Sequence, residues 1–185
     1  MDFGGTTGGG NIVIVDYGTY TGTVGSEFQL ASDTTTSARG GAGTIVDDTV
    51  NSQITVNLGF LDLTWNNDST NSLWDGNTSA NWTSGAGNTT YFDGDSVTFS
   101  NAGSGTVTLS NGGSTIAPGK VIFDNALTSS YSINANTTET LTVAPGGGLQ
   151  ILTNNSSADI TINAELVGGG VVTKGRTVSG ASNVG

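Results

Sequence analysis

The sequence predicts an all-β protein built from many short strands, and three observations predict it. Gly, Thr, Ser and Asn make up 98 of the 185 residues, and these residue types favour strands or turns over helix interiors. Triples of the form apolar–polar–apolar recur through the second half of the chain. The segments between them are rich in residues that tolerate a positive φ or are preset for turns. A helical bundle is therefore excluded.

The charge balance excludes one class of partner. Four Lys and Arg residues stand against fifteen Asp and Glu residues, which gives a formal net charge of -11. This is the wrong sign for a protein held by phosphate contacts, so we expect no nucleic-acid partner and no anionic membrane surface. The longest apolar run, 12–15, is far below the roughly 20 residues needed to span a bilayer. We therefore expect no membrane insertion.

The residue types that carry most enzyme chemistry are missing from the chain. There is no Cys and no His, so the thiol and imidazole groups of common nucleophiles, proton shuttles and soft-metal sites cannot be built. Paired carboxylates could act as acid and base, but fifteen acids always permit some pair, so their presence predicts nothing. We expect a protein that is not an enzyme and that needs no cofactor.

The first third of the chain predicts a small β region behind a glycine-rich lead. Ile54, Val56 and Leu58 alternate with polar residues and predict a strand that leads on to Trp65. Segment 32–43 has no apolar residue larger than Ala and predicts an exposed loop. Further strands are predicted at 12–15, 17–24 and 27–31. We divide the chain into an N-terminal attachment arm, 1–63, and a Gly/Thr/Asn-rich β domain, 64–185.

Aromatic residues gather in the otherwise polar stretch 64–95, and two interpretations stay open. Aromatic rings bury roughly 150 to 250 Å² each, so a few of them could anchor a polar loop over the end of a sheet. Alternatively the rings form an exposed platform on which a surface glycan stacks, which would make the chain a carbohydrate-binding module. The rings in question are Trp65, Trp74, Trp82 and Tyr91.

From residue 96 onward the two-residue period of a strand is plain. Successive side chains of a strand face opposite ways, so the flanking apolar pair of each triple should point inward and the middle residue should face water. Seven short strands are predicted, centred on the triples 97–99, 107–109, 121–123, 131–133, 141–143, 149–151 and 160–162.

A faint internal repeat favours one architecture over another. The segment TIAPGKVIF at 115–123 resembles TVAPGGGLQI at 142–151, which places Pro118-Gly119 and Pro145-Gly146 twenty-seven residues apart. Such a period is typical of stacked coils, so the expected fold is a β-solenoid with an extended N-terminal arm. The alternative is an antiparallel β-sandwich or jelly roll, which predicts the same triples. Both Pro-Gly pairs predict type II turns.

The segment 73–110 resembles the autotransporter-associated β-strand repeat proteins, which are secreted passengers of bacterial surface proteins. The resemblance is carried by Trp74, the Asn81-Trp82 pair, Phe92 before Gly94-Asp95, the Val97-Thr98-Phe99 strand and the Pro118-Gly119-x-Val121 step. Segment 159–175 is similar to the start of that family's repeat. The resemblance covers about 64–175 and implies a right-handed β-solenoid exposed outside the cell, acting in adhesion or as a stalk.

One acidic pair is a candidate metal site. Asp93 and Asp95 flank Gly94, and hard oxygen ligands at alternating positions could hold calcium. The spacing is not that of an EF-hand loop, and Asp-Gly is first of all a turn signal. We therefore favour a turn at this position and keep calcium as the alternative.

The segment Ile12, Val13, Ile14 and Val15 is the candidate assembly strand. It is a short, flat apolar strand behind a glycine-rich lead, which suits it to pair with the edge of a second copy or of another neighbouring subunit. We expect a non-catalytic structural protein that builds or decorates an extracellular assembly. Residues 1–10 contain no export signal, so either a trimmed piece of an exported bacterial surface protein or a phage virion decoration or fibre protein is expected.

Overall fold

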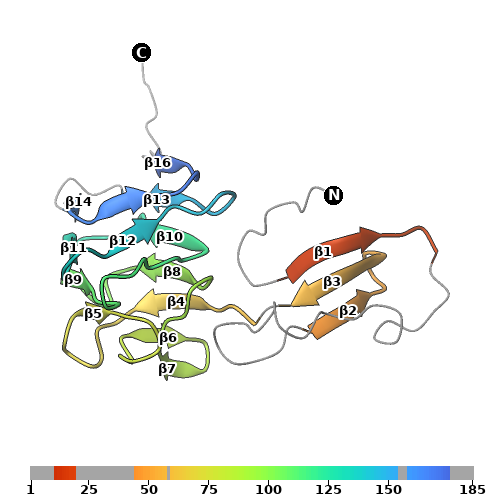
Figure 1. The fold of residues 1–185 in the computed structure, drawn as a ribbon, viewed down its shortest axis with the longest axis horizontal. Coiled ribbons are helices and arrows are strands. Elements are labelled where there is room, and N and C mark those ends of the chain that lie inside the picture. Colours follow the sequence, from red (N-terminus) through yellow and green to blue (C-terminus); the bar gives the residue numbers. More distant parts are fainter. Residues whose placement is uncertain (1–10, 20–43, 58, 154–157, 176–185) are drawn as a thin grey trace, which may run out of the picture.

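The computed structural model describes residues 11–19, 44–57, 59–153 and 158–175, and all its regular elements are strands (Figure 1). No helix occurs among these residues, so none there could cross a bilayer. The all-β prediction is confirmed. The strands are β1 Asn11–Asp16, β2 Thr44–Asp48, β3 Gln53–Asn57, β4 Asp62–Trp65, β5 Leu73–Trp74, β6 Trp82–Ser84, β7 Gly87–Thr89, β8 Ser96–Phe99, β9 Gly105–Leu109, β10 Lys120–Phe123, β11 Tyr131–Ala135, β12 Thr140–Thr142, β13 Leu149–Ile151, β14 Ile160–Ile162, β15 Glu165–Val167 and β16 Val172–Lys174.

The N-terminal strands form a small antiparallel sheet in the order β1-β3-β2. The Tyr17 hydroxyl, just after β1, donates a 2.5 Å hydrogen bond to Asp47 on β2, and this bond raises the pKa of Tyr17 to about 12. The bond therefore ties the end of β1 to the far strand of the sheet. Strand β2 was not predicted, because the segment around it is acidic and carries few apolar residues.

The second and larger part, which we call the β-stack, comprises residues 59–153 and 158–175 and contains three sheets. The first sheet has the order β16-β13-β10-β8-β4-β6-β7, the second β14-β11-β9-β5, and the third β12-β15. From β10 onward the chain runs through the first, second and third sheets in turn and then returns to the first sheet one strand further on. We call each such passage a rung; β10, β11 and β12 make one rung, and β13, β14 and β15 make the next.

Equivalent residues of successive rungs lie side by side in parallel register. In the first sheet Val97 pairs with Val121, Val121 with Leu149, and Leu149 with Val172. In the second sheet the corresponding column runs through Val107, Ile133 and Ile162. In the third it runs through Ile116, Leu141 and Leu166. In each of these three columns apolar side chains therefore stack on apolar side chains.

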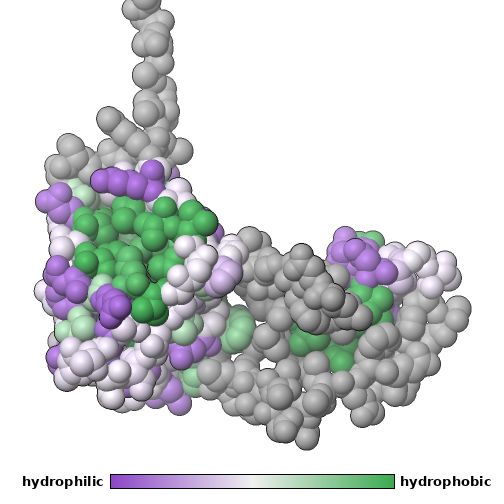
Figure 2. Space-filling model, turned by 45° about the horizontal axis from the view of Figure 1, so that its top comes forward, coloured by the Kyte–Doolittle hydropathy of each residue, from purple (hydrophilic) through white to green (hydrophobic). Residues whose placement is uncertain are grey.

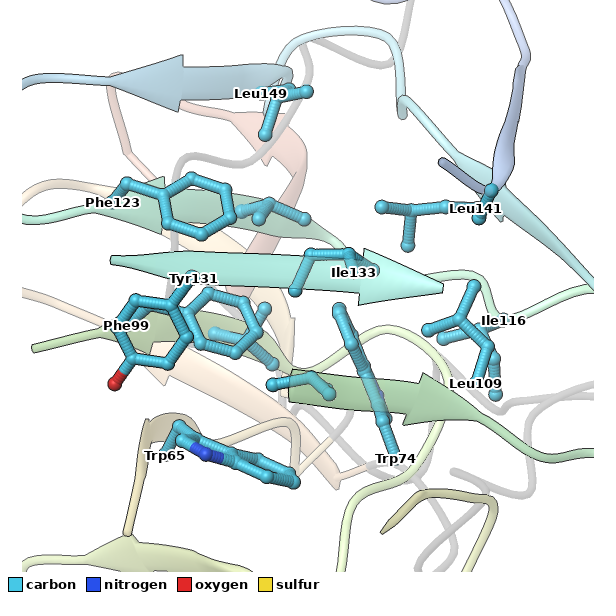
Figure 3. Packing of buried hydrophobic residues seen from close by; sticks show 14 of the residues in the cluster. Trp65, Trp74, Phe99, Leu109, Ile116, Phe123, Tyr131, Ile133, Leu141 and Leu149 are labelled. Atoms are coloured by element: carbon cyan, nitrogen blue, oxygen red, sulfur yellow. The ribbon is translucent and has the colours of Figure 1, made fainter. Parts of the chain in front are cut away.

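The inward positions of these columns form the core, as the two-residue period predicted. All seven predicted triples fall on strands, although Val143 lies one residue beyond the end of β12. Phe99, Leu109 and Phe123 are fully buried, whereas Ile162 in the last rung is only partly buried. The rings of Phe99 and Phe123 stack with centroids 4.8 Å apart and planes 14° apart, and Tyr131 packs edge-on against them (Figure 3).

The beginning of the stack differs from the rest because its outermost strands are antiparallel. Strand β4 pairs in parallel with β8 on one side and antiparallel with β6 on the other, and β6 and β7 form a hairpin. Asp62 and Leu63 already pair with Ser96 and Val97, so the stack begins before the boundary predicted between residues 63 and 64. The continuous strand predicted from Ile54 to Trp65 is instead divided into β3 and β4.

The two Pro-Gly steps lie at equivalent corners but have different backbones. Gly146 has a φ of 82°, which fits the predicted type II turn, whereas Gly119 does not lie in the left-handed region that such a turn requires. The type II prediction is therefore wrong for Pro118-Gly119. A Cβ on Gly119 would lie 2.5 Å from the carbonyl oxygen of Gly94 on the preceding rung. Glycine is required there because two rungs approach closely at this corner.

Several sequence predictions fall outside the described residues. These are the greater part of the strand at 17–24, the strand at 27–31 and the loop at 32–43; residues 17–19 are described and contain no strand. Strands β5, β6, β7, β15 and β16 were not predicted because they are only two or three residues long and have irregular or exposed patterns.

The close approach at Gly119 yields a stability prediction. Gly119→Ala should lower the free energy of unfolding by about 1–3 kcal/mol, because the added methyl group must push two rungs apart. Urea denaturation measures the effect. Gly169→Ala is the control, since a Cβ there meets nothing within 4 Å, and it should change stability by less than about 0.5 kcal/mol. Equal effects of the two substitutions would contradict the packing described for this corner.

Candidate functional site

The aromatic residues of the stretch 64–95 gather in one buried cluster at the beginning of the β-stack. Trp65, Trp74, Trp82 and Tyr91 each have 0% of their surface exposed. The ring centroids of Trp65 and Trp82 are 5.0 Å apart and those of Trp74 and Trp82 are 5.2 Å apart, both in edge-to-face geometry. Phe99 joins the cluster to the aromatic column of the rungs above. The rings therefore close this end of the core.

The prediction of an exposed aromatic platform is wrong. A sugar ring stacks on the face of an accessible side chain, and none of the four rings has an accessible face. The burial of the rings agrees with the alternative interpretation, in which they anchor the polar stretch that carries them. The indole N–H groups of the three Trp residues have no hydrogen-bond partner among the described residues. Their edge-to-face contacts place ring edges against the electron-rich faces of neighbouring rings.

A buried polar network, which the sequence did not reveal, holds the loop that covers these rings. Asn81 is fully buried; its side-chain amide donates to the carbonyl of Leu73 at 2.8 Å, and its oxygen accepts from the amide of Ser69 at 2.9 Å. The Asp75 carboxylate accepts from the hydroxyl of Ser79 at 2.6 Å and from its amide at 2.8 Å. These side chains satisfy backbone groups that would otherwise be buried without partners.

Asp93 and Asp95 both accept hydrogen bonds from protein groups at the corner before β8. The two carboxylate oxygens of Asp95 accept from the amides of Leu61 at 2.8 Å and Phe92 at 2.9 Å. Asp93 accepts from the amide of Ala117 at 2.8 Å and from the hydroxyl of Tyr91 at 2.9 Å. Burial, with the nearby Asp93 carboxylate, raises the pKa of Tyr91 well above its usual value, so the hydroxyl stays a donor.

The turn predicted at Asp93 and Asp95 is confirmed, with a positive φ of 95° at Gly94 between them. The side chains do more than form the turn, since they connect it to Leu61 on one side and to the next rung at Ala117 on the other. In the described part of the chain no three acidic side chains converge as metal ligands would. Calcium binding at this pair stays a prediction.

Glu139 joins two successive rungs, and sequence reasoning missed it. One of its oxygens accepts from the amides of Asn111 at 3.2 Å and Gly113 at 2.9 Å on the preceding rung. The other accepts from the amide of Thr137 at 2.7 Å and from its hydroxyl at 3.1 Å. Only 2% of the Glu139 surface is exposed. The amide donors, Thr137 first, lower the pKa of Glu139 from its ordinary 4.5 to about 2, so the carboxylate is ionised at neutral pH.

The candidate assembly strand 12–15 lies within β1, at one edge of the small sheet. Strand β1 pairs with β3 on one side, and no described strand pairs with its other side. The pairing with β3 is irregular between Val13 and Val15, so the strand is not flat as predicted. Val15 is partly buried, and the side chains of 11–14 lie outside the described residues.

Comparison with family models, with curated proteins and with solved structures found no match.

The bonds to Glu139 predict a pH-dependent stability. Because the folded pKa of about 2 lies below the ordinary 4.5, the stabilisation from this group is fully present above pH 4.5 and is lost as the pH falls toward 2. Glu139→Gln should therefore unfold at lower urea than the wild type at neutral pH, and the difference should shrink progressively between these two pH values. Urea midpoints at a series of pH values measure this.

The matched control is Glu165→Gln, which removes the same charge at an exposed position. This control measures how far the urea midpoint changes when the net negative charge of the chain is lowered by one. A difference between wild type and Glu139→Gln that stays constant down to pH 2 would show that the carboxylate is not held by the amides of two rungs.

The buried cluster predicts a large loss of stability on truncation of one ring. Trp82→Ala should lower the free energy of unfolding by about 3–5 kcal/mol, because the ring contacts four other aromatic rings in a closed core. Val50→Ala, at a side chain that is 91% exposed, should stay within about 0.5 kcal/mol of the wild type. Tryptophan fluorescence of the folded wild type that iodide quenches freely would overturn the account of the cluster.

Proposed function

We propose that this chain is a non-catalytic structural module of an outward-facing assembly. In this proposal the β-stack is a right-handed β-solenoid that projects from the assembly, and the residues that precede the β-stack are the arm that attaches it. The single observation that carries the proposal is the parallel register of successive rungs, in which β8, β9, β10 and β11 each pair in parallel with the equivalent strand one circuit later. Such folds are rod-like, and each rung contacts only its neighbours.

The pairing supports a solenoid over the sandwich alternative. An antiparallel sandwich would pair sequential strands through hairpins, whereas β8, β10, β13 and β16 are joined in parallel across intervening strands of other sheets. Parallel neighbours require a long crossover, and here the crossover is the passage through the second and third sheets. This topology supports a scaffold whose length is set by the number of rungs.

The chemistry of the described side chains supports a structural role. The most buried carboxylates, at Asp95 and Glu139, accept bonds from backbone amides at corners, which is a task of folding. The chain is rich in Ser, Thr and Asn and poor in charge, so uncharged polar side chains can hydrate its surface. We therefore propose binding or building as the role, with no reaction and no cofactor.

We propose an extracellular location for the protein on the basis of the family resemblance. Trp74, the Asn81-Trp82 pair and the Val97-Thr98-Phe99 strand support a likeness to autotransporter-associated repeat passengers, which implies a bacterial surface fibre or adhesin. A decoration or fibre protein of a phage particle has the same physical requirements. Both are extracellular assemblies of β-rich modules.

The partner in this proposal is a second copy of the chain or a neighbouring subunit, and the contact is made by β1. An edge strand presents a row of N–H and C=O groups that a strand of another chain can pair with. The irregularity between Val13 and Val15 would direct that pairing to the start of the strand, at Asn11–Val13.

Assembly through β1 can be tested by deleting the N-terminal residues and by introducing one charged side chain into the strand. Removing residues 1–24 should abolish the assembly seen by electron microscopy and sedimentation, while the tryptophan fluorescence of the β-stack stays that of the wild type. In the full chain, Ile12→Lys should weaken assembly because a lysine on an edge strand opposes pairing. Thr7→Lys adds the same charge ahead of the strand and should assemble normally. A truncated chain that still assembles refutes the proposed role of the arm.

A further inference from the structure

Asparagine is the commonest strongly hydrophilic residue of the chain, with 18 copies against 15 Asp and Glu residues. Figure 2 shows strongly hydrophilic residues in separate groups on the face of the β-stack that is turned to the viewer. The side-chain amide of Asn is chemically labile, because the backbone nitrogen of the next residue can attack it. Glycine hinders this attack least, since it has no Cβ. Asn111 is the one Asn of the sequence that a glycine follows.

The Asn111-Gly112 pair lies in a tight turn after β9. Gly112 and Gly113 have φ values of 61° and 78°, and the amide of Ser114 donates to the carbonyl of Asn111 at 3.0 Å. Two central residues with positive φ are typical of a type I′ turn, which Asn and Gly favour. Gly112 is exposed, and a Cβ placed on it would meet nothing within 4 Å. Water therefore has access to this side of the turn.

The nitrogen that would attack Asn111 is not held by a hydrogen bond. The amides on either side of it, those of Asn111 and Gly113, donate to one carboxylate oxygen of Glu139 at 3.2 Å and 2.9 Å. The amide of Gly112 between them donates to no group of the described residues. It is therefore free to lose its proton to solvent and to turn toward the side chain.

Two other exposed asparagines, Asn101 and Asn125, differ in this respect. Each precedes an alanine, which places a Cβ beside the nitrogen. After Asn101 the alanine amide donates to the hydroxyl oxygen of Ser100 at 3.2 Å. After Asn125 it donates to the carboxylate of Asp124 at 3.2 Å. These bonds must break before the nitrogen can attack, so the two positions serve as slow internal references.

The corner that carries Asn111 also joins neighbouring rungs. The side-chain nitrogen of Asn111 donates to the carbonyl of Thr115 at 3.2 Å, within the same corner. Its side-chain oxygen lies over Gly76, where an added Cβ would be only 3.2 Å away. Gly76 follows β5, which pairs with β9 at the beginning of the stack. On the other side the bonds to Glu139 lead to the next rung. A change at residue 111 is therefore felt on both sides of its rung.

We propose that Asn111 is a site of spontaneous deamidation, with water as the only co-reactant. The deprotonated nitrogen of Gly112 attacks the Cγ atom of Asn111, and the new N–Cγ bond closes a five-membered succinimide ring. The Cγ–Nδ2 bond breaks, and the side-chain nitrogen leaves as ammonia with the proton that the Gly112 nitrogen lost. Water then opens the ring. Cleavage of the N–Cγ bond leaves Asp, whereas cleavage of the original peptide bond leaves isoaspartate, whose main chain is one atom longer.

Both products weaken the link between the two rungs. Each puts a carboxylate on residue 111, whose amide is bonded to the carboxylate of Glu139, and like charges held close together repel. Isoaspartate also lengthens the backbone between the two amides that Glu139 accepts. Conversion at Asn111 therefore lowers the stability of the β-stack. This inference does not depend on the proposed assembly role.

Peptide mass mapping of the full chain tests the site after incubation in mildly alkaline buffer, where the amide proton is lost more readily. We expect Asn111 to convert to a mixture of Asp and isoaspartate at least about tenfold faster than Asn101 and Asn125 convert. Asn111→Gln should suppress conversion at this position, because the longer side chain must close a less favourable ring, and it should leave the two references unchanged.

Two results of the mapping would overturn the proposal. These are an Asn111 that stays intact in the folded chain, and an Asn111 that converts no faster than Asn125.

Urea midpoints at neutral pH test the effect of the product on the β-stack. Asn111→Asp carries the charge of the product and should unfold at lower urea than the wild type. The control Asn88→Asp adds the same charge at an exposed position of the β6–β7 hairpin and should shift the midpoint less. In the Glu139→Gln background the effect of Asn111→Asp should be at least about twofold smaller, because the repelling carboxylate is absent. An equal effect in both backgrounds would contradict the weakening proposed for this corner.

Discussion

The whole β-stack depends on one constraint, which is that each inward side chain must stack on its equivalent in the next rung. A rung buries too little surface to be stable alone, so its apolar residues are covered only when a parallel neighbour lies in register. The Phe99–Phe123 pair is the clearest case, because a one-residue shift of either strand would turn its ring out of the core and place Thr98 or Ile122 inside. The register of these short strands is therefore set by stacking between rungs and not by the length of the strands.

Polar side chains at the corners also hold the rungs in register, because they bond to the backbone of neighbouring rungs. Asp95 and Glu139 each accept backbone amides from both sides of a corner or from two different rungs. Asp93 accepts one amide, from Ala117 on the next rung, together with the hydroxyl of Tyr91. Asn101 does the same work with a neutral side chain, since it accepts from the amide of Thr128 and donates to the carbonyl of Ala126. Few charges are needed in such a fold, because the carboxylates that are buried bind to the backbone. The low content of Lys and Arg agrees with this arrangement.

The parts of the fold that could be predicted are those that depend on local alternation. Triples such as Val97-Thr98-Phe99 place two side chains inward whatever the tertiary partner, so strand and burial followed from the sequence. Whether the tryptophans are buried or exposed could not be predicted, because burial of a ring in a polar stretch depends on which rung lies beside it. Glu139 was missed for a related reason: its donors at Asn111 and Gly113 are remote in sequence and become neighbours only through the stacking. The difference between Gly119 and Gly146 likewise reflects a contact between rungs and not the Pro-Gly signal itself.

The most direct test of this account is the direction of strand pairing in solution. Nuclear Overhauser contacts between backbone protons distinguish parallel from antiparallel neighbours, because the Hα atoms of paired residues approach closely only in antiparallel strands. The account predicts parallel-type Hα-to-amide contacts that link the Val97–Phe99 segment to Val121–Phe123, and that segment in turn to Leu149–Ile151. Close Hα–Hα contacts between any two of these three strands would contradict it.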